Sequence, residues 1–186
     1  HANGEQEGKT YHPGTNKWYY IYLPSWDSGE QKLKSVYGGT IIDGHSIPAF
    51  HQYRFQQVFG IQGEMMLRQD EFVPISLGSP QGVNISGSAD PGTTGGHTAT
   101  DGKRIVSLIG VEDATGVLWQ WGREGGATND VGSSYANAYD SNDENVGGQH
   151  YEAPNRPIFG GHWDAGAQCG SRGSGWGDPA LILHAL

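Results

Sequence analysis

The chain's only cysteine, Cys169, is the first residue to consider for chemistry, because a thiolate is a strong nucleophile. It lies in a glycine-rich stretch, FGGHWDAGAQCGSRGSGWGDP (residues 159–179), close to Arg172, whose charge would favour the thiolate. Nucleophilic catalysis also needs a base. The available histidines are His150, His162 and His184. No motif ties any of them to the thiol, so we favour a simpler interpretation of Cys169 as a small residue that fills a tight turn.

Oxygen-bearing side chains gather in DSNDEN (Asp140–Asn145), and such groups are the ligands that Ca²⁺ prefers. The stretch lacks the spacing of an EF-hand loop, which favours a solvated acidic loop instead. The eight histidines form neither H-x-x-x-H nor H-E-x-x-H, so a zinc site is not expected. The glycine-containing segments also lack the phosphate-binding and dinucleotide-binding patterns, which argues against a nucleotide site.

A recognition surface is the remaining chemistry that the glycine-rich stretch favours. Seven glycines alternate there with Trp163, Trp176 and small polar side chains. Aromatic side chains give contact area at low entropic cost, and small polar groups add adaptable hydrogen bonds. An aromatic face beside Asp and Asn would also suit sugars. The alternative, that both indoles belong to the core, stays open at this point.

The elements that must hold these residues are short. KWYYIYLPSW (Lys17–Trp26) is aromatic and β-branched, which predicts a strand that ends near Pro24. SVYGGTII (Ser35–Ile42) predicts a second strand. Helical spacing of apolar residues predicts a helix over Gly44–Gly60, with Ser46 as N-cap, Pro48 in the first turn and Gly60 at the end. A second helix is predicted within Arg68–Gly78, limited by Pro74.

The rest of the chain combines long polar excursions with strand-like segments. Ser79–Gly102 consists almost entirely of turn formers, and long ordered loops tend to be functional. Lys103–Trp121 has strand-like sequence with a turn at Glu112–Gly116, and ALILHAL (residues 180–186) predicts a final strand. The pattern predicts an α+β domain with two helices, short antiparallel strands and long ordered loops.

The overall composition excludes several classes of protein. The 186 residues carry a formal charge of −9, which argues against non-specific binding to nucleic acid or to anionic membranes. No apolar run approaches 18 residues, so membrane insertion is not expected. A single cysteine rules out an internal disulfide and a multi-cysteine zinc site.

Three stretches together resemble one superfamily. GVEDATGVLWQW (Gly110–Trp121) is similar to the G-x-x-D-x-x-G-x-x-W-x-W signature of the formylglycine-generating-enzyme type of C-type-lectin fold. Gly78–Gly110 resembles the segment that precedes this signature in the variable proteins of diversity-generating retroelements. Residues 159–179 resemble the C-terminal variable region of those proteins. The resemblance runs from about Thr40 to Leu186.

The resemblance implies a C-type-lectin-like ligand-binding domain over residues 40–186, with an N-terminal arm or strand segment for assembly over residues 1–39. It also divides the variable region into a frame and a set of contact positions. The frame would consist of Gly160, Gly161, Trp163, Gly166, Gly170, Ser171 and Arg172. The ligand-binding residues would be His162, Asp164, Gln168, Ser174, Trp176 and Asp178, with Ala165, Gly175 and Gly177 at further exposed positions.

The chain differs from the enzymes of this superfamily at residues that those enzymes use for catalysis and for Ca²⁺ binding. Those enzymes use a pair of cysteines, and this chain has one, so their oxidase activity is not expected. Their Ca²⁺ site takes Asn and Glu from a G-N-V-W-E-W segment, where this chain has Val117 and Gln120. We therefore expect no cofactor, with Ca²⁺ as the open alternative.

The function that the resemblance implies is non-catalytic recognition. The protein would lie on the surface of a bacteriophage virion, as a tail-fibre tip or head-surface adhesin, and bind a host-cell surface protein or glycan. Its partners would be that receptor, other virion proteins and copies of itself, as a homotrimer. One alternative is a structural decoration or capsid-associated protein that uses the fold for assembly. Another is a thiol-dependent relative of the formylglycine enzymes.

Overall fold

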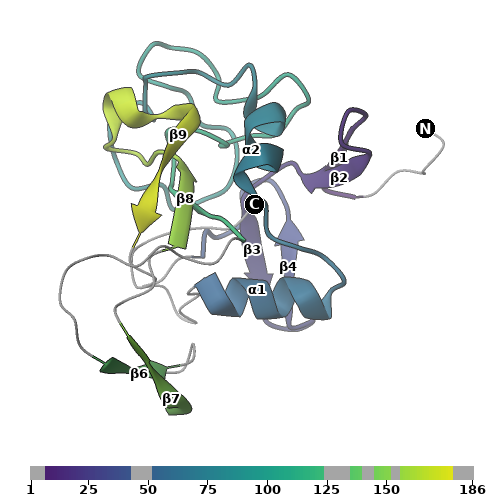
Figure 1. The fold of residues 1–186 in the computed structure, drawn as a ribbon. Coiled ribbons are helices and arrows are strands. Elements are labelled where there is room, and N and C mark those ends of the chain that lie inside the picture. Colours follow the sequence, from purple (N-terminus) through teal and green to yellow (C-terminus); the bar gives the residue numbers. More distant parts are fainter. Residues whose placement is uncertain (1–6, 43–51, 124–134, 140–144, 152–155, 178–186) are drawn as a thin grey trace.

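The computed structural model describes residues 7–42, 52–123, 135–139, 145–151 and 156–177 (Figure 1). Within these ranges the chain forms two α-helices and four small antiparallel sheets. The helices are α1 (Gln52–Ile61) and α2 (Gln69–Ser76). The strands are β1 (Lys9–His12), β2 (Lys17–Tyr20), β3 (Pro24–Asp27), β4 (Lys32–Ser35), β5 (Gln120–Trp121), β6 (Tyr135–Tyr139), β7 (Asn145–Tyr151), β8 (Arg156–Gly160) and β9 (Gly170–Gly177). The α+β prediction is confirmed.

Two successive hairpins, β1–β2 and β3–β4, replace the single strand predicted over Lys17–Trp26. That prediction was wrong because the chain bends after Tyr20. At the bend the Tyr22 N–H does not bond to a neighbouring strand but donates to Ser35 Oγ at 3.0 Å. Pro24 begins β3 instead of ending a strand, a position where its missing N–H costs no ladder hydrogen bond.

The strand predicted over Ser35–Ile42 was also wrong. β4 ends at Ser35, and Gly38 follows in a left-handed conformation with a φ of 69°. Beyond this turn only isolated bridges at Thr40 and Ile41 remain. The Gly39 N–H donates to Thr94 Oγ1 at 3.0 Å, so the segment is tied to the long loop and not to a ladder.

Both helices form where apolar side chains fall on one face. Phe55, Val58 and Phe59 of α1 are buried, whereas its glutamines at 56 and 57 are exposed. The helix ends at Ile61, one residue beyond the predicted stop at Gly60. The predicted N-cap Ser46 and Pro48 lie outside the described residues.

The second helix, α2, lies within its predicted range and contains Pro74. Glu71 Oε2 accepts a hydrogen bond from the Arg68 N–H at 3.0 Å, which satisfies a donor at the start of the helix. Phe72 and Ile75 are buried, and the helix contacts β9. This contact brings α2 against the sheet that carries the glycine-rich stretch.

The larger core cluster joins the two ends of the described chain. Tyr19 and Leu23 pack in the same cluster as Phe72, Val117 and Phe159. The division at residue 40, with an assembly role for residues 1–39, stays a prediction. Any assembly surface on that segment must be made by side chains other than the ones packed into this core.

Lys103–Trp121 forms turns and single bridges where we predicted strands, and only β5 at its end is a named strand. The reason is backbone conformation, because Gly110, Asp113 and Gly116 have φ values of 87°, 61° and 71°. Such residues interrupt an extended ladder. The long loop predicted over Ser79–Gly102 is confirmed, since it contains bridges and turns but no named element. The predicted final strand over residues 180–186 lies outside the described residues.

Candidate functional site

The three-stranded sheet β5–β8–β9 positions the glycine-rich stretch. Its central strand β8 is antiparallel to both neighbours, with Phe159 opposite Gln120 on one side and Ser174 on the other. The register shifts after Phe159, so Gly160 lies opposite Gly170. The chain between these two glycines leaves the sheet as a turn that includes a 3₁₀ segment, η1 (Gly166–Gln168). This turn carries His162 and Asp164.

His162 is half-buried, and its ring is fixed by a local hydrogen bond. The Asp164 N–H donates to His162 Nδ1 at 3.1 Å. Burial lowers the pKa of His162, and the nearby carboxylates of Asp164 and Asp90 offset this in part. The imidazole is therefore neutral at pH 7, and because Nδ1 accepts a hydrogen bond the ring proton lies on Nε2. His162 thus keeps one N–H group as a donor.

Three of the other predicted contact residues have exposed side chains. Asp164 lies in the turn, Gln168 at the end of η1 and Ser174 on β9. Trp176 is on β9 opposite Pro157, but its side chain is not among those described, and Asp178 lies outside the described residues. The exposure of these groups is what a contact surface requires, and their role in binding stays a prediction.

The predicted frame is built by hydrogen bonds from the long loop. The Asn84 side-chain amide donates to the Trp163 backbone carbonyl, and the indole of Trp163 packs against the larger core cluster. Gln81 Oε1 accepts from the Ser171 N–H at 2.8 Å, and Gln81 Nε2 donates to Ser171 Oγ at 3.1 Å. Arg172, in contrast, is exposed. Sequence reasoning missed Gln81 and Asn84, since nothing in the turn-forming segment SPQGVN marks them.

Trp119 is a further residue that sequence reasoning did not assign to the site. Its ring centroid lies 6.0 Å from that of His162, and the His162 centroid lies 5.6 Å from that of Trp163. Both ring pairs are edge-to-face, and all three side chains are partly buried. A parallel bridge between Val117 and His162 brings the two segments together. The W-x-W part of the signature was the available signal.

Cys169 is not poised for nucleophilic chemistry. The side chain is 4% exposed, and burial raises the pKa of its thiol to about 11. The thiol is therefore protonated at pH 7, and it donates a weak hydrogen bond to the His162 carbonyl at 3.5 Å. These contacts fit the predicted role of Cys169 as a small residue in a tight turn.

The two signature positions that differ from the enzymes serve the core. Val117 is fully buried, and Gln120 Nε2 donates to the carbonyls of Asp113 and Ala114 at 3.2 and 3.0 Å. Val117 offers no side-chain oxygen, whereas Gln120 Oε1 is buried and has no hydrogen-bond partner among the described residues. Among the described residues no three His, Cys, Asp or Glu side chains lie together as metal ligands. The acidic stretch at 140–145 lies almost wholly outside those residues.

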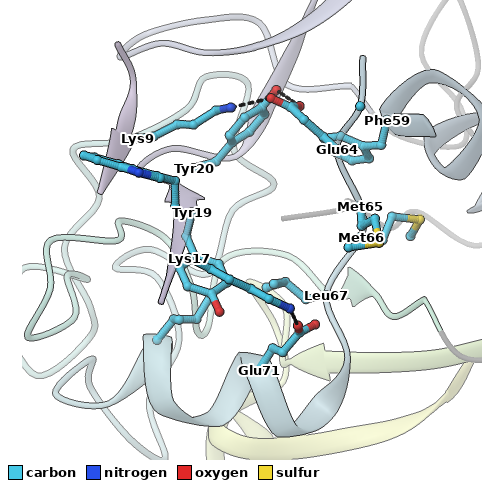
Figure 2. A pocket seen from close by; sticks show the side chains of 13 residues that line it. Lys9, Lys17, Tyr19, Tyr20, Phe59, Glu64, Met65, Met66, Leu67 and Glu71 are labelled. Carbon is cyan, nitrogen blue, oxygen red and sulfur yellow. Dashed lines mark hydrogen bonds and ion pairs between the residues drawn. The ribbon is translucent and has the colours of Figure 1, made fainter. Parts of the chain in front are cut away.

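A cavity of about 290 Å³ lies apart from this surface, between the β1–β2 hairpin and the segment that links α1 to α2 (Figure 2). Apolar side chains that include Phe59, Met66 and Leu67 line it. Lys9 and Lys17 of the hairpin form ion pairs with Glu64 and Glu71 across it. These two ion pairs tie the hairpin to the helical part of the chain.

The ion pair at Glu64 has an additional buried partner, and this gives a testable stability effect. Glu64 Oε2 accepts from the Tyr20 hydroxyl at 2.6 Å, and burial together with this carboxylate raises the pKa of Tyr20, so the phenol stays protonated. Glu64→Ala is expected to lower the free energy of unfolding by about 1–2 kcal/mol, because the Tyr20 hydroxyl loses its shorter hydrogen bond and keeps only the one to the Leu33 carbonyl at 3.3 Å. Glu64→Gln keeps an acceptor and is expected to cost about half as much. Urea unfolding measures both, and equal losses would show that the hydroxyl contact contributes nothing.

The comparisons with known proteins agree with the fold described above. No protein-family model matches the chain. Over 166 residues it is 32% identical to a tail fiber receptor-binding protein of Bordetella phage BPP-1, a match that covers 88% of this chain and 41% of that protein. The solved structures of the U1 and M1 variants of Major Tropism Determinant match with a TM-score of 0.76 and 26% identity, covering 97% of this chain and 52% of theirs. The chain thus spans about half the length of these proteins or less, and the predicted C-type-lectin-like fold is confirmed.

Proposed function

The chain is a homologue of a phage tail-fibre receptor-binding protein and has the C-type-lectin-like fold of Major Tropism Determinant, and on that premise we propose that it is a receptor-binding adhesin of a phage virion. It binds a molecule on the host-cell surface through the turn between β8 and β9. The binding is non-catalytic, which agrees with a buried and protonated Cys169 thiol. None of the helices among the described residues has the length and apolarity needed to cross a membrane.

One observation carries the proposal. Asp164, Gln168 and Ser174 expose their side chains on a backbone whose conformation is fixed by other residues, namely the glycines of the frame, Gln81 and Asn84. Surface side chains with no structural partner exchange at little cost in stability. A rigid frame that holds such side chains outward is suited to recognition, because little order has to be gained on binding.

Display in several copies completes the proposal. Contacts made by a few exposed polar side chains give weak single sites, and multivalent display raises avidity by roughly 10²–10⁴. We propose a homotrimer, attached to other virion proteins, as the arrangement that supplies this avidity. Residues 1–39 are the segment proposed to serve assembly.

The proposed contact surface is tested by a double substitution, His162→Ala with Asp164→Ala. We expect the purified protein to bind whole host bacteria. The affinity of the double variant for these cells is expected to be lower by a factor of about ten or more, because two central contacts are lost. The measurement is a cell-binding titration by flow cytometry with fluorescently labelled protein.

The matched control is Gln56→Ala with Asp70→Ala, which removes an exposed polar side chain from α1 and an exposed carboxylate from α2, outside both the turn and residues 1–39. This control is expected to bind like the unmodified protein. If the unmodified protein binds no host cells, or if both double variants bind equally well, the proposed adhesin surface is wrong. Burial of the turn against another virion subunit would instead favour the structural alternative.

A further inference from the structure

The cavity between the β1–β2 hairpin and the segment that links α1 to α2 lies where the two core clusters meet. Tyr19 and Leu67 on its wall belong to the larger cluster. Tyr20, Phe59 and Met66 on its wall belong to the smaller cluster. Each of these five side chains is at most 9% exposed, so the wall is held in place by the packing behind it. The cavity of about 290 Å³ is far larger than the voids of a close-packed core.

The cavity opens to solvent on one side. Of the residues that line it, Met65 is 62% exposed, Lys17 is also exposed and Trp18 is partly exposed. A small compound can therefore reach the buried wall from solvent without unfolding of the chain. A concave site of this size with a preformed apolar wall is typical of small-molecule binding.

The charged groups at the cavity are paired with one another. Lys9 pairs with Glu64 at one end, and Lys17 pairs with Glu71 at the other (Figure 2). The four charged side chains among the described lining residues thus neutralise one another. A charged ligand would have to break one of these pairs or leave its own charge unbalanced, and both are costly in a partly buried site. The cavity therefore favours an uncharged ligand.

The uncharged part of the lining favours an aromatic ligand. It includes four aromatic and two thioether side chains, namely Trp18, Tyr19, Tyr20, Phe59, Met65 and Met66. Aromatic rings and methionine sulfur both make favourable contacts with a further ring. A sugar would need many hydrogen bonds, whereas the charged groups here already bond to one another. Since an apolar cavity of about 150 Å³ binds one benzene ring, this cavity has room for two fused rings.

We propose that this cavity is a binding site for a small uncharged aromatic compound of about the size of indole. The site is separate from the turn between β8 and β9, so the inference does not depend on the proposed adhesin function. Its walls come from the hairpin and from the helical part of the chain. A bound compound therefore strengthens the contact between these two parts and stabilises the folded protein.

The experiment uses the chain's two methionines, Met65 and Met66, because both line the cavity. Indole is titrated into protein with ¹³C-labelled methionine methyl groups, and the two signals are followed by NMR. We expect both to move upfield through the ring current and to saturate in the millimolar range. Tryptamine and indole-3-acetate carry opposite charges on the same ring system, and both are expected to bind about tenfold more weakly. Methyl glucoside, the sugar probe, is expected to cause no saturable shift.

Lys9→Gln tests the selection against charge. It leaves the Glu64 carboxylate without its lysine, so tryptamine is expected to bind this variant at least as tightly as indole does. Lys32→Gln is the matched control, because it breaks an ion pair with Glu30 in the β3–β4 hairpin, away from the cavity. This control should keep the preference for indole. An unchanged preference in the Lys9 variant would overturn the selection for an uncharged ligand.

Ile75→Phe tests the location of the site. Ile75 lines the cavity and is 1% exposed, so the larger ring takes up space that the ligand needs, and the response to indole is expected to be lost. Ile61→Phe makes the same change at a residue that is 79% exposed and does not line the cavity, and it should respond normally. An Ile75→Phe variant that fails to fold is recognised by its loss of chemical-shift dispersion. The unmodified protein and Lys9→Gln then decide.

The remaining outcomes concern the source of the ring. Nα-acetyl-tryptophan methylamide carries the indole on a peptide backbone, and we expect it to bind more weakly than free indole because the buried wall leaves no room for the backbone. Tighter binding than indole would overturn the proposal in favour of a tryptophan side chain of a partner protein. If indole causes no saturable shift up to its solubility limit, the site is wrong. Binding of the protein to host cells tests the adhesin function separately, and neither result determines the other.

Discussion

Asp113→Ala is expected to lower the free energy of unfolding by about 3–4 kcal/mol, through a buried donor left unsatisfied and a strained backbone position. The Asp113 carboxylate is fully buried, and its Oδ2 accepts the Gly95 N–H at 2.6 Å and lies 2.9 Å from His97 Nδ1. The backbone of Asp113 has a φ of 61°, which aspartate tolerates better than alanine does. Urea unfolding followed by tryptophan fluorescence gives the magnitude.

Two comparison variants separate these causes. Asp113→Asn keeps an oxygen acceptor for the Gly95 N–H and tolerates the same φ, so it is expected to cost only about 1 kcal/mol. Asp101→Ala removes an aspartate that also accepts a backbone N–H, from Lys103 at 3.1 Å, but at the surface. It is expected to stay within about 1 kcal/mol of the unmodified protein. An Asp113→Ala variant as stable as Asp101→Ala would show that the buried carboxylate does not hold the fold together.

The effect of Asp113 extends to the recognition turn through the signature segment. The Asp113 carbonyl accepts from Gln120 Nε2 on β5, and the Gly116 N–H donates to the Gly160 carbonyl on β8 at 3.1 Å. On its other side Asp113 holds the long loop through Gly95. A weakened signature turn therefore loosens both the sheet and the loop that frame the turn.

The sequence predicts the parts of this fold that depend on local pattern. The helix containing Phe55, Val58 and Phe59 follows from apolar spacing, and the turn at Glu112–Gly116 follows from its small and polar residues. The strands around Tyr22 and Gly38 could not be predicted, because their ends are set by hydrogen bonds to Ser35 and Thr94, which are made only in the folded chain. Periodicity carries no information about such partners.

The same limit applies to the candidate site. The order of Gly, Trp and polar residues identified the stretch that contains His162 and Asp164. It did not identify Trp119, which is more than 40 residues earlier and reaches His162 only because Val117 bridges that residue. Gln81 was missed for the same reason, since its contact with Ser171 spans 90 residues. Contacts between distant segments decide which side chains complete a loop-built surface.

Gly160→Ala is the second substitution with a large expected effect, a loss of about 3–5 kcal/mol in the free energy of unfolding, from left-handed strain and overpacking. Gly160 has a φ of 90°, and an added Cβ would lie 2.5 Å from the Ala114 carbonyl oxygen and 3.2 Å from Phe72 Cζ. Neither neighbour has room to move, because Ala114 belongs to the signature turn and Phe72 is stacked on Phe159 with centroids 5.3 Å apart.

Gly166→Ala is the matched control for this effect. Gly166 also has a positive φ, of 50°, but an added Cβ would meet no atom within 4 Å. Only the backbone strain remains, so we expect a loss of about 1–2 kcal/mol. Gly160 ends β8 where the turn that carries His162 and Asp164 begins, and Gly166 lies within that turn. The difference between the two variants therefore measures the steric contacts of Gly160 together with the larger strain at its φ of 90°. Thermal unfolding of the two variants measures this difference. Equal midpoints would show that the close packing of Gly160 against the signature turn does not fix the turn between β8 and β9.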